Sequence, residues 1–123
     1  MKIQEAAENY LEAIYMLKNK LGRVRSIDIC KKLNYSKPTV SVMMKQFREN
    51  GYIEMDPDGF IVLTDKGVKI AEVMYERHNV IAQLLISIGV DEETAFTDSC
   101  KMEHDMSEKS FNCMKQYFLK NNK

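Results

Sequence analysis

Apolar residues recur at helical spacing along most of the chain, which predicts a mostly α-helical protein. The first such pattern covers residues 4–20, and we expect this helix to end near Leu21 because Gly22 follows as a stop signal. A longer pattern runs from Thr64, a residue that can cap a helix, to Gly89. Between these two patterns the apolar residues form shorter runs, which predicts short helices and strands there.

The central region has the order of elements of a helix-turn-helix. The stretch SIDICKKLNYSKPTVSVMMKQFRENG holds a short apolar pattern that Ser26 can cap, a turn at Asn34, and a second pattern of about 12 residues that Ser36 can cap. Pro38 stands in the first turn of the second helix, where a missing N–H costs little. Gly51 lies just past its end, as a C-terminal glycine does.

A β-hairpin is predicted directly after the second helix. The stretch YIEMDPDGFIVLT reads as two short strands around a turn at residues 56–59, and a hairpin in this place is the wing of a winged helix-turn-helix. We therefore expect a winged helix-turn-helix with a small β-hairpin wing over residues 1–64 and an α-helical domain over residues 65–123. In that second domain, further helices should begin at Asp91, for about 15 residues, and at Ser107. The long helix is apolar on more than one face toward its end, as in helices that pack against a second subunit.

Charge is divided unevenly along a chain whose formal net charge is zero. From Lys18 to Arg48 there are nine Lys or Arg and one acid, a local charge of +8, whereas residues 91–108 hold seven acids and one lysine, a local charge of −6. This favours one half that binds a polyanion and one that binds cations, although two solvated helical faces of opposite sign would give the same pattern. No apolar run approaches the roughly 20 residues needed to cross a bilayer, and the three cysteines form no CxxC pair, so we expect a cytoplasmic protein with reduced thiols.

The predicted second helix of the helix-turn-helix has a small, basic outer surface. Its apolar positions Val40, Met43, Met44 and Phe47 follow helical spacing and are expected in the core. Small hydroxyl side chains at a helix N-terminus suit close approach to phosphates and base edges. The alternative is a small lobe that binds protein or nothing. The positions left outside are Lys37, Thr39, Ser41, Val42, Lys45 and Arg48.

The stretch CKMEHD places metal-ligand side chains close together. On a helix, Cys100, Glu103 and His104 stand at i, i+3 and i+4 and project from one face. A thiolate, a carboxylate and an imidazole form half of a site for a divalent transition metal. The same spacing also fits a helix that faces water, with Cys100 simply buried. Further donors stand at His78, Asn9 and Glu12.

The chain resembles the diphtheria toxin repressor and manganese transport regulator family of metal-dependent transcriptional repressors. The matching stretches are ENYLEAIYMLKNKLGRVRSIDICKKLNYSKPTVSVMMKQFRENGYIE, GFIVLTDKG, ERHNVIAQLLISIGVDEE and CKMEHDMS, and they cover nearly the whole length. The resemblance implies a homodimer whose winged helices read a palindromic double-stranded DNA operator and whose C-terminal helices dimerise. It implies a repressor of metal-homeostasis genes that is switched on by bound metal. A third, SH3-like domain found in larger members is not expected.

The resemblance also assigns site residues. The metal ligands would be Asn9, Glu12, His78, Cys100, Glu103 and His104. The residues that meet DNA would be Arg25, Ser36, Lys37, Pro38, Thr39, Ser41, Val42 and Lys45. A thiolate at Cys100 matches the iron-responsive members, so Fe²⁺ is the expected metal, with Mn²⁺ as an option and Co²⁺, Ni²⁺ or Zn²⁺ able to bind in vitro.

Some positions depart from the family pattern. Asn9 offers a weaker ligand than the usual Asp or Met, and Ala82 and Phe96 stand where relatives carry donors to a second metal, so one site is expected. Asp58 replaces an arginine in the wing, so that turn should contribute little to phosphate binding. These departures motivate one alternative, a winged-helix regulator that has lost metal control and answers to another ligand or partner. A metalloenzyme is the other alternative, but no general base or substrate cleft can be recognised, so we expect no enzyme and no small organic substrate.

Overall fold

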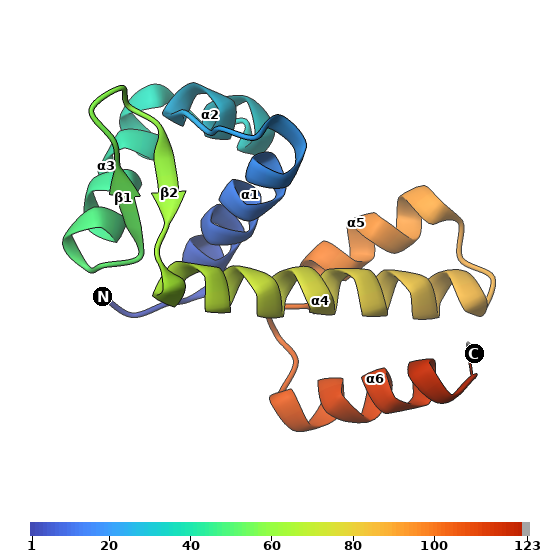
Figure 1. The fold of residues 1–123 in the computed structure, drawn as a ribbon. Helices are drawn as coiled ribbons and strands as arrows, with labels where there is room; N and C mark the ends of the chain where they lie inside the picture. Colours follow the sequence, from blue (N-terminus) through green and yellow to red (C-terminus); the bar gives the residue numbers. More distant parts are fainter. Residues whose placement is uncertain (122–123) are drawn as a thin grey trace. The chain divides into compact units, whose positions relative to one another are not determined.

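The computed structural model describes residues 1–121, and within this range the chain forms helices and one two-stranded antiparallel sheet (Figure 1). It divides into two compact units, Met1–Val73 and Met74–Lys123, with the boundary inside one helix. No helix in the described range is long and apolar enough to span a membrane. The mostly α fold with an N-terminal winged helix-turn-helix is confirmed. The elements are α1 (Glu5–Leu21), α2 (Ser26–Leu33), α3 (Lys37–Glu49), β1 (Ile53–Met55), β2 (Ile61–Leu63), α4 (Asp65–Ser87), α5 (Glu92–Met102) and α6 (Glu108–Asn121).

The predicted local signals around the helix-turn-helix operate as expected at α3. The Ser36 hydroxyl accepts a hydrogen bond from the Thr39 N–H, and Pro38 stands in the first turn. The turn before it depends on Asn34, which has a left-handed backbone with φ 57°. These three signals are local in sequence, so they fix where α2 ends and α3 begins.

The start of α2 differs from the prediction by one residue. Ser26 is the first helical residue and does not cap α2; the cap is Arg25. The physical reason is Asp28, whose carboxylate accepts the Arg25 N–H at 2.9 Å and so moves the helix start back by one position.

The core of the first unit is centred on Phe47 of α3. Its ring is fully buried and meets the rings of Tyr10 and Tyr52 edge-on, at centroid distances of 6.1 Å each. Val40 and Met44 are buried beside it as the spacing predicted, and Met43 is partly buried at the margin. This core sets α3 against α1 and the hairpin, so the outer face of α3 is presented to solvent.

The wing is a two-stranded hairpin with a third edge contact. β1 and β2 pair antiparallel, with Met55 opposite Ile61. The turn is closed by Asp56, whose carboxylate accepts the N–H groups of Asp58 and Phe60 at 2.9 Å each. On the far side of β2, the Ile61 N–H donates to the Val24 carbonyl at 2.7 Å. The wing is thereby tied to the segment that precedes α2.

In the second unit, α5 is shorter than predicted. Asp91 caps it through the Thr94 N–H, as expected, but the helix ends at Met102 after 11 residues rather than about 15. Glu103 is its C-cap residue and His104 lies in the following turn. The physical reason is Arg77 of α4, which donates to the carbonyls of Glu103 and Met106 at 3.0 and 2.8 Å. A guanidinium in this place takes the carbonyl groups that further helical turns would use.

Candidate metal centre and DNA-reading face

Four of the six predicted metal ligands converge inside the second unit. His78 Nδ1, on α4, lies 3.2 Å from Glu103 Oε2 and 3.4 Å from Cys100 Sγ. The other carboxylate oxygen, Glu103 Oε1, lies 3.2 Å from His104 Nε2. The Glu103 carboxylate therefore stands between two imidazoles, with the Cys100 thiol beside one of them.

The donor set and its burial fit a divalent transition metal. Glu103 is fully buried, and the side chains of His78 and His104 are only 10% and 1% exposed. Two imidazole nitrogens, a carboxylate and a thiol are ligands that iron, cobalt, nickel and zinc accept. A carboxylate removed from water needs a compensating positive charge, which a bound cation would supply.

Without a metal, a proton on His78 supplies that positive charge. Hydrogen bonds to the side chains of Cys100 and Glu103 raise the pKa of His78 to about 10, against its burial, which lowers it. A cation that takes His78 as a ligand must displace this proton. Metal binding is therefore favoured as pH rises and weakened as pH falls.

Two neighbours of His78 hold its imidazole in place. The Ser99 hydroxyl is buried, lies 3.1 Å from His78 Nδ1 and bonds the Phe96 carbonyl at 3.0 Å. The Phe96 ring lies against the imidazole at 5.4 Å between centroids. Sequence reasoning missed Ser99, and its position next to Cys100 is the one signal that could have found it.

Arg77 supports the turn that carries two ligands, and sequence reasoning missed it too. It is 8% exposed, and its guanidinium lies 5.3 Å from the Phe111 ring of α6. Its two hydrogen bonds to the carbonyls of Glu103 and Met106 bind the turn from both ends. Outer groups of this kind orient ligands and tune metal affinity.

Replacing Arg77 by methionine is therefore expected to weaken metal affinity about 10- to 100-fold, because the ligands stay but their turn loses its anchor. Competition with a chromophoric chelator measures this. The matched control is Lys115→Met, which removes another cation bonded to α4, the Lys115 to Glu76 ion pair at 2.7 Å, and should leave metal affinity unchanged. Equal affinity in both variants would show that Arg77 does not position the ligands.

The other two predicted ligands lie on α1, in the first unit. Asn9 and Glu12 are one turn apart on that helix. Glu12 is 6% exposed, and the other buried positions of α1 are apolar except for the tyrosine hydroxyl of Tyr10. A cation stabilises a carboxylate that is withdrawn from water, so Glu12 stays a predicted metal ligand.

The predicted DNA-contacting residues of α3 lie along its solvent face. Thr39, Ser41, Val42 and Lys45 are all exposed. Lys45 has a 4.0 Å contact with Glu49, and both side chains are mostly exposed, so this pair restrains the ammonium little. Beside them runs a groove of about 340 Å³ lined by Ser26, Ser41, Val42, Met44, Lys45, Arg48 and Met55.

The first two residues of α3 and the residue before α2 complete this face. Lys37, Pro38 and Arg25 are exposed, and Ser36 and Thr39 share a hydrogen bond of 2.8 Å between their hydroxyls. The two hydroxyls therefore stabilise the start of α3 and mark the helix N-terminus, where phosphates are favoured.

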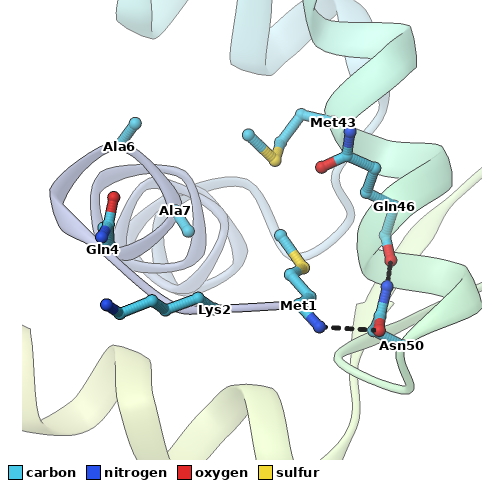
Figure 2. A pocket seen from close by; sticks show the side chains of 8 residues that line it. All are labelled: Met1, Lys2, Gln4, Ala6, Ala7, Met43, Gln46 and Asn50. Atoms are coloured by element: carbon cyan, nitrogen blue, oxygen red, sulfur yellow. Dashed lines mark hydrogen bonds between the residues drawn. The ribbon is translucent and has the colours of Figure 1, made fainter.

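A second groove lies on a different face of α3 (Figure 2). Its volume is about 450 Å³, and the Met1 amino group donates across it to Asn50 Oδ1 at 3.4 Å. Its side chains offer amides, thioethers and one ammonium, but no carboxylate, imidazole or thiol. The groove therefore lacks the chemistry of a metal centre. It is lined by Met1, Lys2, Gln4, Ala6, Ala7, Met43, Gln46 and Asn50.

Comparison with known proteins decides the family. The chain is 34% identical over 117 residues to a transcriptional regulator MntR of Escherichia coli, covering 95% of this chain and 76% of that protein. It belongs to the iron-dependent repressor family of metal-dependent transcriptional regulators. Family models described as the N-terminal DNA binding domain and the metal binding and dimerisation domain of the iron dependent repressor match residues 2–60 and 64–122. An HTH-type transcriptional regulator MntR of Bacillus subtilis is 36% identical over 100 residues, covering 81% of this chain and 70% of that protein.

Two solved structures have the same fold as this chain. The metal-dependent transcriptional regulator MtsR superposes with a TM-score of 0.81 at 25% identity, over 89% of this chain and 52% of that one. An IdeR of T. acidophilum gives a TM-score of 0.80 at 24% identity, over 96% of this chain and 55% of that one. The chain thus spans about half the length of these solved structures.

Proposed function

We propose that this chain is a metal-dependent repressor that binds palindromic operators of metal-homeostasis genes as a homodimer when loaded with Fe²⁺ or Mn²⁺. The observation that carries the proposal is the cluster of His78, Glu103, His104 and Cys100 in a chain that also holds a winged helix-turn-helix. The first three side chains are withdrawn from water, and Cys100 stands at the exposed edge. A regulator of this kind acts on genomic DNA, so its place is the cytoplasm.

In this proposal, Asn9 and Glu12 complete the coordination of the metal. They stand on α1, which is part of the winged-helix core, whereas the other four ligands belong to the second unit. One ion shared by both groups would restrict how the winged helix is placed. Metal binding would then be converted into DNA affinity by linkage, since the cation favours the arrangement that binds the operator.

Fe²⁺ is the metal we favour, because Cys100 supplies a sulfur ligand. Thiolates suit iron, cobalt, nickel and zinc better than Mn²⁺, which prefers oxygen donors. Relatives named MntR and a solved manganese-dependent repressor with bound manganese make Mn²⁺ the alternative. Affinities for Fe²⁺, measured without oxygen, and for Mn²⁺ distinguish the two.

Cobalt titration tests the metal centre directly. A Co²⁺ ion bound by the Cys100 thiolate is expected to give an intense sulfur-to-metal absorption band, and Cys100→Ser should lose that band. Cys113→Ser is the matched control, because Cys113 is an exposed thiol on α6 away from the cluster residues in sequence, and it should keep the band. Reduced wild-type protein that shows no band with cobalt would rule out the centre as proposed.

A gel shift on genomic fragments, run with each of several divalent metals and with chelator, tests the regulatory function. Retardation that requires metal supports it, and retardation that is the same with chelator would favour a regulator without metal control. The homodimer is supported by large apolar side chains exposed in the second unit, namely Ile88, Tyr117 and Leu119. Light scattering at micromolar concentration should give the mass of a dimer; a monomeric mass would contradict it.

The exposed face of α3 should carry sequence recognition. Thr39→Ala and Lys45→Ala are each expected to weaken operator binding by about 1 to 3 kcal/mol, because each removes a side chain from the face that enters the major groove. Fluorescence anisotropy with a labelled operator measures the loss. Gln46→Ala is the control on the same helix, since Gln46 lines the groove of Figure 2, and it should bind normally. Normal binding by both test variants would place the recognition surface elsewhere.

A further inference from the structure

Two arginines at the base of the wing share one aromatic ring. The guanidinium carbons of Arg23 and Arg25 lie 5.0 and 4.1 Å from the centroid of Phe60. The alternation of an extended chain explains this placement. Val24 between the arginines is buried and bridges to buried Ile61, so its two neighbours and Phe60, the neighbour of Ile61, project to the opposite face.

The positive charges of this pair have no acidic partner within 4.0 Å in the part of the chain that the structure describes. Two nearby acids make other contacts: Asp56 accepts two backbone N–H groups of the wing turn, and Asp28 accepts the backbone N–H of Arg25. Asp58 is exposed and forms no ion pair with either arginine. A guanidinium stacked on a ring is held in one orientation while its N–H edge stays available for an anion. The pair is thus a preorganised site for a planar or tetrahedral oxyanion.

The pair borders the DNA-reading groove. Arg25 directly precedes Ser26, which lines the groove together with Ser41 and Lys45 of α3, and the wing reaches the same groove through Met55. The Arg25 guanidinium also covers the wing turn, 3.5 Å from the place where a Cβ on Gly59 would lie. The pair is therefore linked to the groove through Ser26, the next residue after Arg25, and through the wing.

We propose that Arg23 and Arg25, stacked on Phe60, form a clamp for the phosphodiester backbone of duplex DNA beside the groove that α3 enters. The inference rests on the proposed DNA-binding function and extends it by assigning Arg23 and Phe60. The clamp provides the positive charge that the wing turn lacks, since Asp58 stands exposed at its tip. Because phosphates carry no sequence information, the clamp contributes equally to operator and to unrelated duplex DNA.

Salt dependence tests the clamp. Each phosphate contact releases counterions, so the slope of log K against log salt concentration should fall by about 0.9 for Arg23→Gln and about 1.8 for the Arg23→Gln/Arg25→Gln double variant. Binding is measured with metal-loaded protein between about 50 and 200 mM salt, on an operator fragment and on an unrelated duplex. Lys109→Gln on α6 is the control, since it removes the same charge from an exposed position in the other unit and should leave the slope unchanged.

Phe60→Leu tests the stack itself without changing charge. It should weaken binding to both duplexes by the same factor, whereas Thr39→Ala should weaken operator binding selectively and keep the slope. Circular dichroism shows whether the Phe60→Leu protein is folded. If that protein is unfolded, the salt slopes of the arginine variants still test the clamp. A wild-type slope in the double variant overturns the clamp and leaves the proposed function standing. Wild-type protein that binds no DNA with any metal overturns the proposed function itself.

Discussion

Replacing Glu103 by glutamine is expected to abolish the part of DNA affinity that depends on metal. The carboxylate lies 3.2 Å from both His78 Nδ1 and His104 Nε2, so its neutral isostere removes the charge at the centre of the cluster and faces an imidazole with an amide N–H. Coupling between effector and ligand sites is typically worth about 1 to 3 kcal/mol, so metal should no longer raise operator affinity by roughly 5- to 150-fold. Anisotropy titrations with saturating metal and with chelator measure both states.

The control for this variant is Glu92→Gln, at the other end of α5. Glu92 is exposed in the first turn of α5 and should leave the metal response intact. DNA binding in chelator should be the same in the wild-type, Glu103→Gln and Glu92→Gln proteins. This comparison separates a lost metal site from a damaged winged helix. A Glu103→Gln protein that still gains operator affinity on adding metal would show that this carboxylate is not a required ligand.

Replacing Phe47 by alanine should lower the free energy of unfolding by about 3 to 5 kcal/mol. The ring is fully buried between Tyr10 and Tyr52, and its loss leaves a cavity in the centre of the winged helix that neighbours cannot fill. Since single domains are stable by only about 5 to 15 kcal/mol, much of the first unit's stability would be lost. Urea denaturation followed by circular dichroism measures the change.

Val42→Ala gives the matched comparison on α3. Val42 is 60% exposed, so its truncation should change the free energy of unfolding by no more than about 0.5 kcal/mol. The two variants together separate the packing role of α3 from its DNA-reading role. A loss below about 1.5 kcal/mol for Phe47→Ala would mean that the core of this unit is organised around other residues.

Local signals in the sequence predicted most of the winged helix correctly. The Ser36 cap, the turn at Asn34 and the stop at Gly22 act through neighbours within a few residues, so they can be recognised without the fold. At the start of α2 two local capping signals compete, and the predicted helix start is wrong by one residue. Asp28 captures the Arg25 N–H, and this decides against the Ser26 cap.

The residues that supply the metal ligands were predictable from the sequence, but the turn that carries two of them was not. Helical spacing placed Cys100, Glu103 and His104 on one face, and the resemblance to a repressor family added His78 as a ligand. The end of α5 at Met102 could not be read from the sequence, because it depends on Arg77, which is 26 residues from Glu103. Arg77 takes carbonyl groups that a longer helix would have used, and it leaves His104 in a turn rather than on the helix face.

The sequence by itself determined the order of elements, the residues of the recognition helix and the kinds of ligand available. These follow from periodicity, capping and charge, which operate over a few residues at a time. The tertiary structure alone decided that one carboxylate stands between two imidazoles and that two arginines share the ring of Phe60. Both arrangements join residues that are distant along the chain, and only packing of whole elements brings such residues within contact distance.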